Sequence, residues 1–183
     1  MAENLAYLPN VAGPNTGSAN NPIYYVYGYS GNNVIDAKAT DNYQTYGVLY
    51  NWTAAATACP PGWHLPTDAE WKTLEMHLGM SKTESYDSYR GTDEGGKLKE
   101  TGTVHWRGPN TGATNRSGFT ALPGGYRYDG GVFSDIGNYG GWWSATESNS
   151  YYAWFRNLSN SGSYIYRYYY NKELGFSVRC LKD

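Results

Sequence analysis

Apolar and polar side chains alternate most regularly between Tyr152 and Tyr170. Alternation with a period of two is typical of β-strands, so this stretch predicts a β-hairpin with the loop Ser161-Gly162. A slip of one residue in register would exchange the two faces of the hairpin. In the predicted register one face belongs to the core and consists of Trp154, Arg156, Leu158, Ile165, Arg167 and Tyr169, while the other consists of Phe155, Asn157, Ser159, Tyr164, Tyr166 and Tyr168.

Arg156 and Arg167 are predicted to be cross-strand neighbours on the core face. Like charges in this position need a shared acid, because an isolated buried charge costs roughly several kcal/mol. We predict that Glu147 or Asp135 bridges the two guanidinium groups. The same register pairs Leu158 with Ile165, Trp154 with Tyr169, Phe155 with Tyr168, and Asn157 with Tyr166.

The second face of the hairpin combines Tyr and Phe rings with Asn and Ser side chains. Rigid amphipathic rings beside short hydrogen-bonding groups are typical of antibody paratopes, so the pattern predicts a binding surface. An alternative is that a second layer of the same domain covers the tyrosines, which are also good strand formers. The candidate ligand-binding residues are Tyr151, Tyr152, Phe155, Asn157, Ser159, Tyr164, Tyr166, Tyr168 and Tyr170.

Upstream, the clearest helix signal is the capping box formed by Thr67 and Glu70. It predicts a helix from Asp68 to about Leu78, with a buried stripe of Trp71, Leu74 and Leu78. The remaining expectations are an irregular lead-in over residues 1–21 anchored by Leu5, Tyr7 and Leu8, a strand over 23–27, a first helix over 47–58, an exposed loop over 80–94, a helical turn over 95–100, strands over 117–122, 126–128 and 132–133, and a strand leading into the hairpin over 142–146.

Composition narrows the class of protein. A chain of 183 residues is long enough for one well-buried domain, and 20 Tyr with 23 Gly indicate many rings and many turns. The formal net charge is −2 and there is no basic block, so we expect no nucleic-acid partner. No apolar run approaches the ~20 residues of a membrane span, so we expect no direct membrane insertion. The sequence contains no signal peptide, which leaves either a cytoplasmic protein or one whose leader is missing.

Cys59 and Cys180 lie far apart, which argues against a CxxC redox or zinc site. Two readings remain open: a disulfide, which would stabilise the fold by roughly 4–5 kcal/mol, or two buried free thiols. His64, His77 and His105 have no second ligand at metal spacing, so we expect neither a metal site nor a cofactor.

Eight segments in order resemble the Fibrobacter succinogenes major paralogous domain family. They are MAENLAYLP, YGVLYNW, CPPGWHLPTDAEW, GGKLKETG, SGFTALPGGYR, WWSATE, AWFRNL and GFSVRC, which together span nearly the whole chain. The resemblance implies a single α+β domain over residues 1–183 with a C-type lectin-like fold. That fold has two helices and a twisted, mostly antiparallel sheet with a long C-terminal hairpin.

The resemblance has further implications. Cys59 and Cys180 would form the long disulfide of lectin-like domains. Met1 would lie inside a family motif, with a leader or another domain upstream, and the module would be extracellular or on a bacterial cell surface, often as part of a lipoprotein. Calcium-dependent sugar binding does not carry over, because the Glu-Pro-Asn, Gln-Pro-Asp and Trp-Asn-Asp triplets do not occur. Formylglycine-generating chemistry does not carry over, because Cys180 stands alone in its region.

The fold family also includes variable proteins of diversity-generating retroelements. Adenine-directed mutagenesis of Asn codons yields Tyr, Ser, Phe and similar residues, and the nine candidate ligand-binding positions hold only such residues. They interleave with framework residues such as Trp154 and Arg156. Static family members could have the same residues, so both readings stay open.

Three functions are compatible with these patterns. The first is a non-enzymatic module that binds a protein or glycan through the hairpin face. The second is a structural or assembly module whose hairpin face is buried against a neighbouring copy or domain. The third is an enzyme, for which only His64, Asp68 and Glu70 lie close in sequence, and the capping box already accounts for Glu70.

Overall fold

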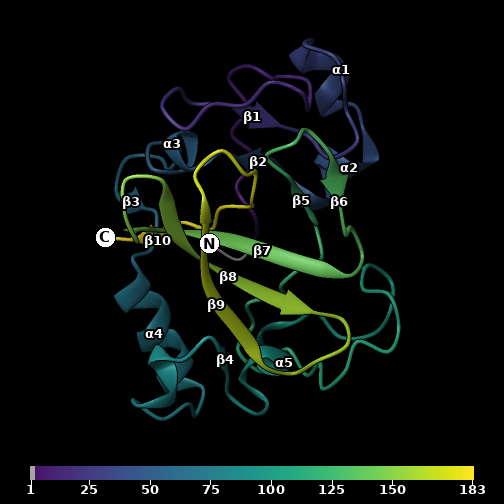
Figure 1. Cartoon of the computed structure of the whole chain (residues 1–183). Coiled ribbons are helices and arrows are strands. Elements are labelled where there is room, and N and C mark those ends of the chain that lie inside the picture. The colour runs from purple at the N-terminus through teal and green to yellow at the C-terminus, as the bar shows by residue number, and fades with distance from the viewer. Residues whose placement is uncertain (1–2) are drawn as a thin grey trace.

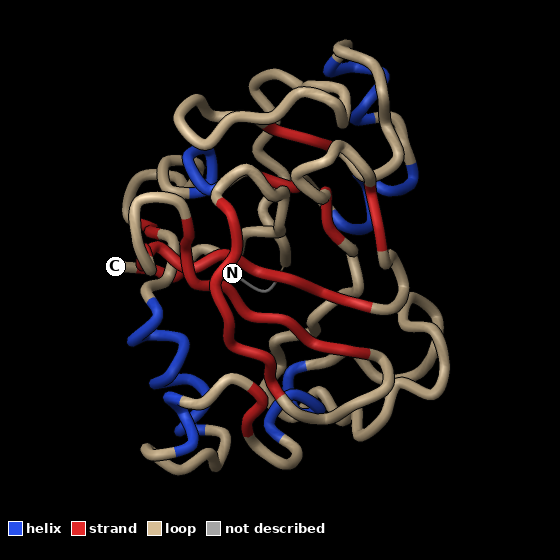
Figure 2. The backbone as a smooth tube through the Cα atoms, viewed as in Figure 1, coloured by secondary structure: helices blue, strands red, loops and turns tan. Residues whose placement is uncertain are grey.

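A four-stranded antiparallel sheet lies at the centre of the computed structural model, which describes residues 3–183. The strand order is β4-β9-β8-β7, and Figure 1 shows β7, β8 and β9 side by side across the middle of the molecule. Much of the remaining chain is loop, as Figure 2 shows, in keeping with the many glycines. The four strands are β4 (Tyr89–Arg90), β7 (Tyr139–Glu147), β8 (Tyr152–Ser159) and β9 (Ile165–Asn171).

The predicted hairpin register is confirmed. Strand β8 pairs with β9 so that Trp154 lies opposite Tyr169 and Arg156 lies opposite Arg167. The loop is longer than the predicted Ser161-Gly162, because β8 ends at Ser159 and β9 begins at Ile165.

Three two-stranded ladders complete the β-structure of residues 3–183. They are joined to the central sheet through the segment that follows β9, since Ser177 bridges Trp142 of β7 and Phe176 bridges Tyr50. The ladders pair β1 (Tyr24–Tyr25) with β2 (Leu49–Tyr50), β3 (Trp63–His64) with β10 (Leu181–Lys182), and β5 (Tyr126–Arg127) with β6 (Phe133–Ser134).

Five α-helices occur within residues 3–183, where two were expected. The capping box is confirmed, because Thr67 accepts from the Glu70 amide and the Glu70 carboxylate accepts from the Thr67 amide. The predicted helical turn near residue 95 is present as α5. The helices are α1 (Val34–Lys38), α2 (Asp41–Tyr46), α3 (Trp52–Ala55), α4 (Asp68–His77) and α5 (Glu94–Leu98), with a 3₁₀ turn at Glu84–Tyr86.

Several local expectations are wrong. The segment 47–58 forms β2 before α3, because the backbone of Tyr50 pairs with Phe176 on a distant segment. The segment 117–122 makes only a single bridge at Ala121 instead of a strand. The predicted loop 80–94 contains β4, which pairs with the edge of β9. Tyr7 is half exposed, whereas Leu5 and Leu8 are buried anchors of the lead-in as expected.

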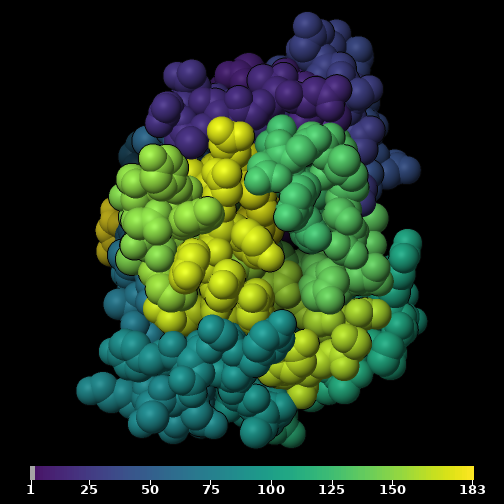
Figure 3. Space-filling view, viewed as in Figure 1, coloured from purple at the N-terminus to yellow at the C-terminus, as the bar shows by residue number. Residues whose placement is uncertain are grey.

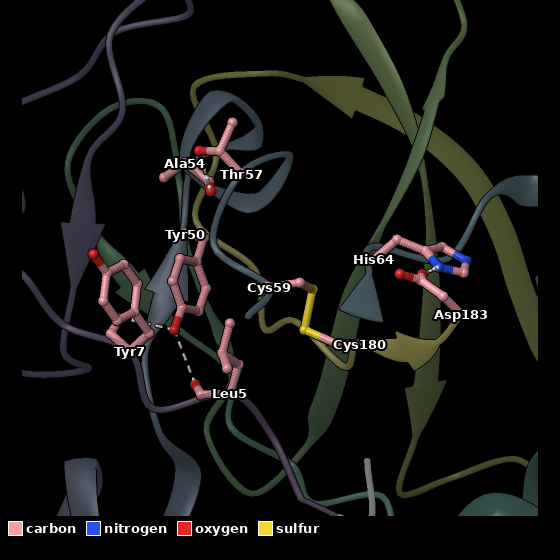
Figure 4. Close-up of a disulfide and its surroundings, with 9 residues drawn as sticks. All are labelled: Leu5, Tyr7, Tyr50, Ala54, Thr57, Cys59, His64, Cys180 and Asp183. Atoms are coloured by element: carbon pink, nitrogen blue, oxygen red, sulfur yellow. Dashed lines mark hydrogen bonds and ion pairs between the residues drawn. A yellow bond between two sulfur atoms is a disulfide. The ribbon is translucent and has the colours of Figure 1, made fainter. Parts of the chain in front are cut away.

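Cys59 and Cys180 form a disulfide, which joins the end of the α3 region to the last residues of the chain. Figure 4 shows it beside Tyr50, whose hydroxyl donates to the carbonyl oxygens of Leu5 and Tyr7 at 3.1 and 2.9 Å. The N-terminal lead-in and the C-terminal segment are therefore held to the same region of the core.

Helix α4 packs against the core face of the hairpin. Trp71 from α4 belongs to one buried cluster with Leu158 and Ile165, as predicted for that face. The acids that bridge the arginines also come from α4, so the prediction of Glu147 or Asp135 is wrong.

Asp68 pairs with both Arg156 and Arg167, and Glu75 pairs with Arg156 and Arg90. Sequence spacing could not show which helix would cover this face. Glu147 instead pairs with Lys172, and Asp135 accepts from the Tyr126 hydroxyl.

Candidate functional site

The second face of the hairpin is partly buried within the domain. Phe155 is 2% exposed and stacks on Phe176 with ring centroids 4.7 Å apart. Ser159 is also buried, with its hydroxyl 2.9 Å from the hydroxyl of Ser161. The two side chains are therefore not displayed on an exposed surface as expected: Phe176, in the segment after β9, covers Phe155, and Ser159 is buried at the end of β8.

A groove of about 440 Å³ opens where that covering is incomplete. It lies between the second face of β8 and β9 and the β5–β6 hairpin, and Figure 3 shows the hollow between the yellow C-terminal residues and the green segment. We call it the tyrosine groove. It is lined by Tyr89, Tyr126, Tyr128, Asp135, Tyr139, Phe155, Asn157, Tyr164, Tyr166, Tyr170, Leu174 and Phe176.

Contacts between rings hold the walls of the tyrosine groove. On one side Tyr89 lies 4.5 Å from Tyr166 and 5.5 Å from Tyr164, measured between ring centroids. On the other side Tyr126 lies 5.9 Å from Phe176. Edge and tilted contacts of this kind stabilise aromatic pairs by about 0.5–1.5 kcal/mol beyond the burial of their area. The groove is thus a largely pre-formed surface.

The polar groups of the groove are few. The Tyr126 hydroxyl donates to Oδ2 of Asp135 at 2.8 Å, while Oδ1 of Asp135 makes no hydrogen bond within residues 3–183. The side-chain amide of Asn157 likewise makes no hydrogen bond to the described part of the chain. Both groups are therefore available to a ligand. No Lys or Arg is among the lining residues.

Burial keeps four phenols of the groove in their neutral, hydrogen-bonding form. Burial, followed by the hydrogen bond to Asp135, raises the pKa of Tyr126 to about 12. Burial and the neighbouring Tyr89 raise the pKa of Tyr166 to about 12, and burial also raises the pKa of Tyr164 and Tyr170. At neutral pH each hydroxyl can both donate and accept.

Lys99 and α5 hold in place the β8–β9 loop that presents Tyr164. The buried ammonium of Lys99 donates to the carbonyl oxygens of Thr111, Ser159 and Gly162 at 2.8–2.9 Å. In α5, a Cβ added to Gly95 would collide with the carbonyl oxygen of Tyr164. Close packing thus explains both glycines before Lys97, because Gly95 lies against the hairpin loop and Gly96 lies against the backbone of Gly112.

Five of the nine predicted ligand-binding residues line the groove: Phe155, Asn157, Tyr164, Tyr166 and Tyr170. Tyr168 lies beside it, stacked on Tyr166 at 5.5 Å. Tyr151 and Tyr152 are 71% and 38% exposed and lie outside the lining, as does buried Ser159.

Seven lining residues were not predicted, because they come from other segments. Tyr89 was assigned to a loop, and Tyr126 and Tyr128 were recognised only as part of a short strand. The only signal in the sequence was that tyrosines also occur close together in these segments. The full set missed is Tyr89, Tyr126, Tyr128, Asp135, Tyr139, Leu174 and Phe176.

The cluster of His64, Asp68 and Glu70 is engaged in other contacts. Nε2 of His64 lies 2.9 Å from Glu70 and Nδ1 lies 2.6 Å from Asp183, the latter drawn in Figure 4. Hydrogen bonds that the imidazole donates to the carboxylates of Asp183 and then Glu70 raise the pKa of His64. Asp68 holds the arginines described above. Each of these three groups thus has an observed structural partner.

Across the described residues no group of three or more His, Cys, Asp or Glu side chains could hold a metal ion. Within residues 3–183 no helix has the length and apolar character needed to cross a bilayer.

The chain belongs to the Fibrobacter succinogenes major domain family, whose sequence model matches residues 1–182. No curated protein and no solved structure matches the chain.

Proposed function

We propose that this member of the family is a non-enzymatic module that binds a protein or glycan ligand in the tyrosine groove. The observation that supports this best is the lining itself, in which seven of twelve residues are Tyr and two are Phe. Concave sites lined by aromatic rings with a few well-placed polar groups are typical of ligand binding. Asn157 and Asp135 are the polar groups that would orient the ligand.

The surroundings suit a rigid binding site. The disulfide, the Arg–Asp–Glu cluster under α4 and the triple hydrogen bond of Lys99 all restrain the strands and loop that present the groove. A site that is ordered before binding loses less conformational entropy when the ligand arrives. Aromatic faces suit sugar rings as well as protein side chains.

We further propose a C-type lectin-like fold and an extracellular or cell-surface location. The fold proposal is supported by the α+β architecture, the long C-terminal hairpin and the connection from Cys59 to Cys180. The location is supported by the disulfide, because such bonds persist in oxidising compartments.

Diversification by a retroelement remains a proposal for a narrower set of positions. The half-buried groove residues Asn157, Tyr164, Tyr166 and Tyr170 could vary without removing a core side chain. Variation at Phe155 and Ser159 would replace buried side chains, so these two positions are left out of the proposal. A near-identical neighbouring repeat that differs only at template adenines, beside a reverse transcriptase, would support the proposal, and a constant sequence across strains would contradict it.

The binding proposal is tested with a displayed random-peptide library and an array of defined glycans as probes. Binders selected on the native protein are measured against the single substitutions Asn157→Ala and Tyr164→Ser. We expect each substitution to lower affinity at least about tenfold, because Asn157→Ala removes the side-chain amide and Tyr164→Ser removes an aromatic ring that lines the groove.

The matched control is Tyr151→Ser, which removes an exposed tyrosine directly before β8 and outside the groove. It should leave affinity unchanged. Failure to select any binder, or equal losses for Tyr151→Ser and Tyr164→Ser, would contradict binding in the groove. Melting temperatures of all three variants show whether a loss reflects unfolding.

A further inference from the structure

We propose that the tyrosine groove binds an organic cation, in particular an alkylated ammonium group, held by tyrosine faces and the carboxylate of Asp135. This inference rests on the proposed binding function and specifies the chemistry of its ligand. The same group could be presented by a choline headgroup or by a methylated lysine of a protein.

The charge of the groove favours a cation. Asp135 is the only charged side chain among the twelve lining residues, so the lining has a net charge of −1. No Lys or Arg of residues 3–183 lies within ion-pair distance of the Asp135 carboxylate. By contrast, the buried carboxylates of Asp68 and Glu75 each have two arginine partners.

The backbone at Asp135 supports a specific placement of this carboxylate. Its φ is +63°, a left-handed conformation that few residues other than glycine adopt. In this conformation Oδ2 accepts from Tyr126 at 2.8 Å and Oδ1 makes no hydrogen bond within the described residues. The carboxylate is thus oriented at the groove and is only half satisfied.

The aromatic faces are the second, independent observation. Elsewhere in the fold, aromatic rings are in contact with cationic side chains of the same chain. The Arg167 guanidinium lies 3.6 Å from the ring centroid of Trp154, and the Lys172 ammonium lies 4.6 Å from the ring centroid of Trp52. None of the rings in such contacts lines the groove.

A cation over an aromatic face is attracted to the ring quadrupole, and cages of several rings are a known way to bind quaternary ammonium groups. The groove therefore has seven tyrosines that no cation of residues 3–183 occupies, beside one carboxylate whose Oδ1 makes no hydrogen bond to those residues. A neutral sugar would gain from the rings but not from the charge of Asp135.

Isothermal titration calorimetry with choline and its neutral isostere 3,3-dimethyl-1-butanol tests this directly. The two probes have nearly the same shape and differ in charge. We expect choline to bind about tenfold more tightly, because the tyrosine faces and the Asp135 carboxylate both attract its positive charge. Equal affinities, or no binding of choline, would overturn the inference.

The substitution Asp135→Asn keeps an oxygen that can accept from Tyr126 and removes the charge. It should weaken choline binding about tenfold and leave the isostere unaffected. Asp36→Asn, which removes an exposed carboxylate in α1 outside the groove, is the matched control and should change neither. Equal effects of the two substitutions would refute a local role for Asp135.

A trimethyllysine peptide and choline distinguish the two sources of the ammonium group. Tighter binding of the peptide would indicate a protein ligand, and equal binding would indicate that only the headgroup is recognised. If choline does not bind while the binding of selected peptides or glycans is still weakened by Tyr164→Ser, the cation inference is wrong and the proposed function stands.

Discussion

Arg156 and Arg167 lie directly opposite each other on β8 and β9, and both donate to the same oxygen, Oδ1 of Asp68, at 2.8 Å. Two guanidinium groups side by side in a core are tolerated only because α4 supplies this carboxylate and that of Glu75. The cluster thereby ties the hairpin that forms the tyrosine groove to the helix behind it.

Replacing Asp68 by Asn should lower the free energy of unfolding by about 3–5 kcal/mol, because it leaves buried arginine charge without its partner. Urea unfolding followed by tryptophan fluorescence measures the change. Asp36→Asn removes an exposed acid from the first turn of another helix and is the control, with an expected effect within about 0.5 kcal/mol. A loss of less than about 1 kcal/mol for Asp68→Asn would show that the cluster contributes little.

Acidification should destabilise the protein through the same carboxylate. Burial raises the pKa of Asp68, but the hydrogen bonds and charges of Arg167 and Arg156 outweigh burial and hold it well below its ordinary value of 3.8. The unfolded chain therefore takes up the proton first as the pH falls. The stability from this group is present above about pH 4 and is lost progressively below it.

Unfolding free energies between pH 6 and pH 2 measure this dependence. The slope below pH 4 should be smaller in Asp68→Asn than in the native protein. Identical slopes would assign acid sensitivity to other carboxylates.

Phe155 and Tyr151 were both predicted to contact a ligand, yet they should behave differently. Phe155→Ala removes a ring that is 2% exposed and should cost about 3–5 kcal/mol of stability. Tyr151→Ala removes a ring that is 71% exposed and should change stability by less than about 0.5 kcal/mol. Thermal and urea unfolding of both variants distinguish the two roles, and a neutral Phe155→Ala would place that ring outside the core.

Loss of the disulfide should lower stability by roughly 4–5 kcal/mol in the chain-entropy treatment, since Cys59 and Cys180 are 121 residues apart. Urea unfolding of Cys59→Ala/Cys180→Ala measures the loss. Dithiothreitol should destabilise the native protein and leave the double variant unchanged. A reductant effect on the double variant would point to a cause other than this bond.

Sequence patterns predicted those features that depend on neighbours along the chain. Period-two alternation identified the hairpin and its register, because facing strands joined by a short loop have few alternative pairings. Thr67 and Glu70 predicted the start of α4, because a capping box is completed within four residues. The order of eight motifs pointed to the family, to which residues 1–182 are matched.

Tertiary structure decided which faces were covered and by what. The acids that neutralise Arg156 and Arg167, the burial of Phe155 by Phe176, and the meeting of Tyr89 with Tyr166 each join segments more than twenty residues apart. Alternation along a strand assigns residues to a face, but it contains no information on the distant segment that packs there. The groove is the part of one face that this packing leaves open, so the seven lining residues from other segments could be identified only in the folded chain.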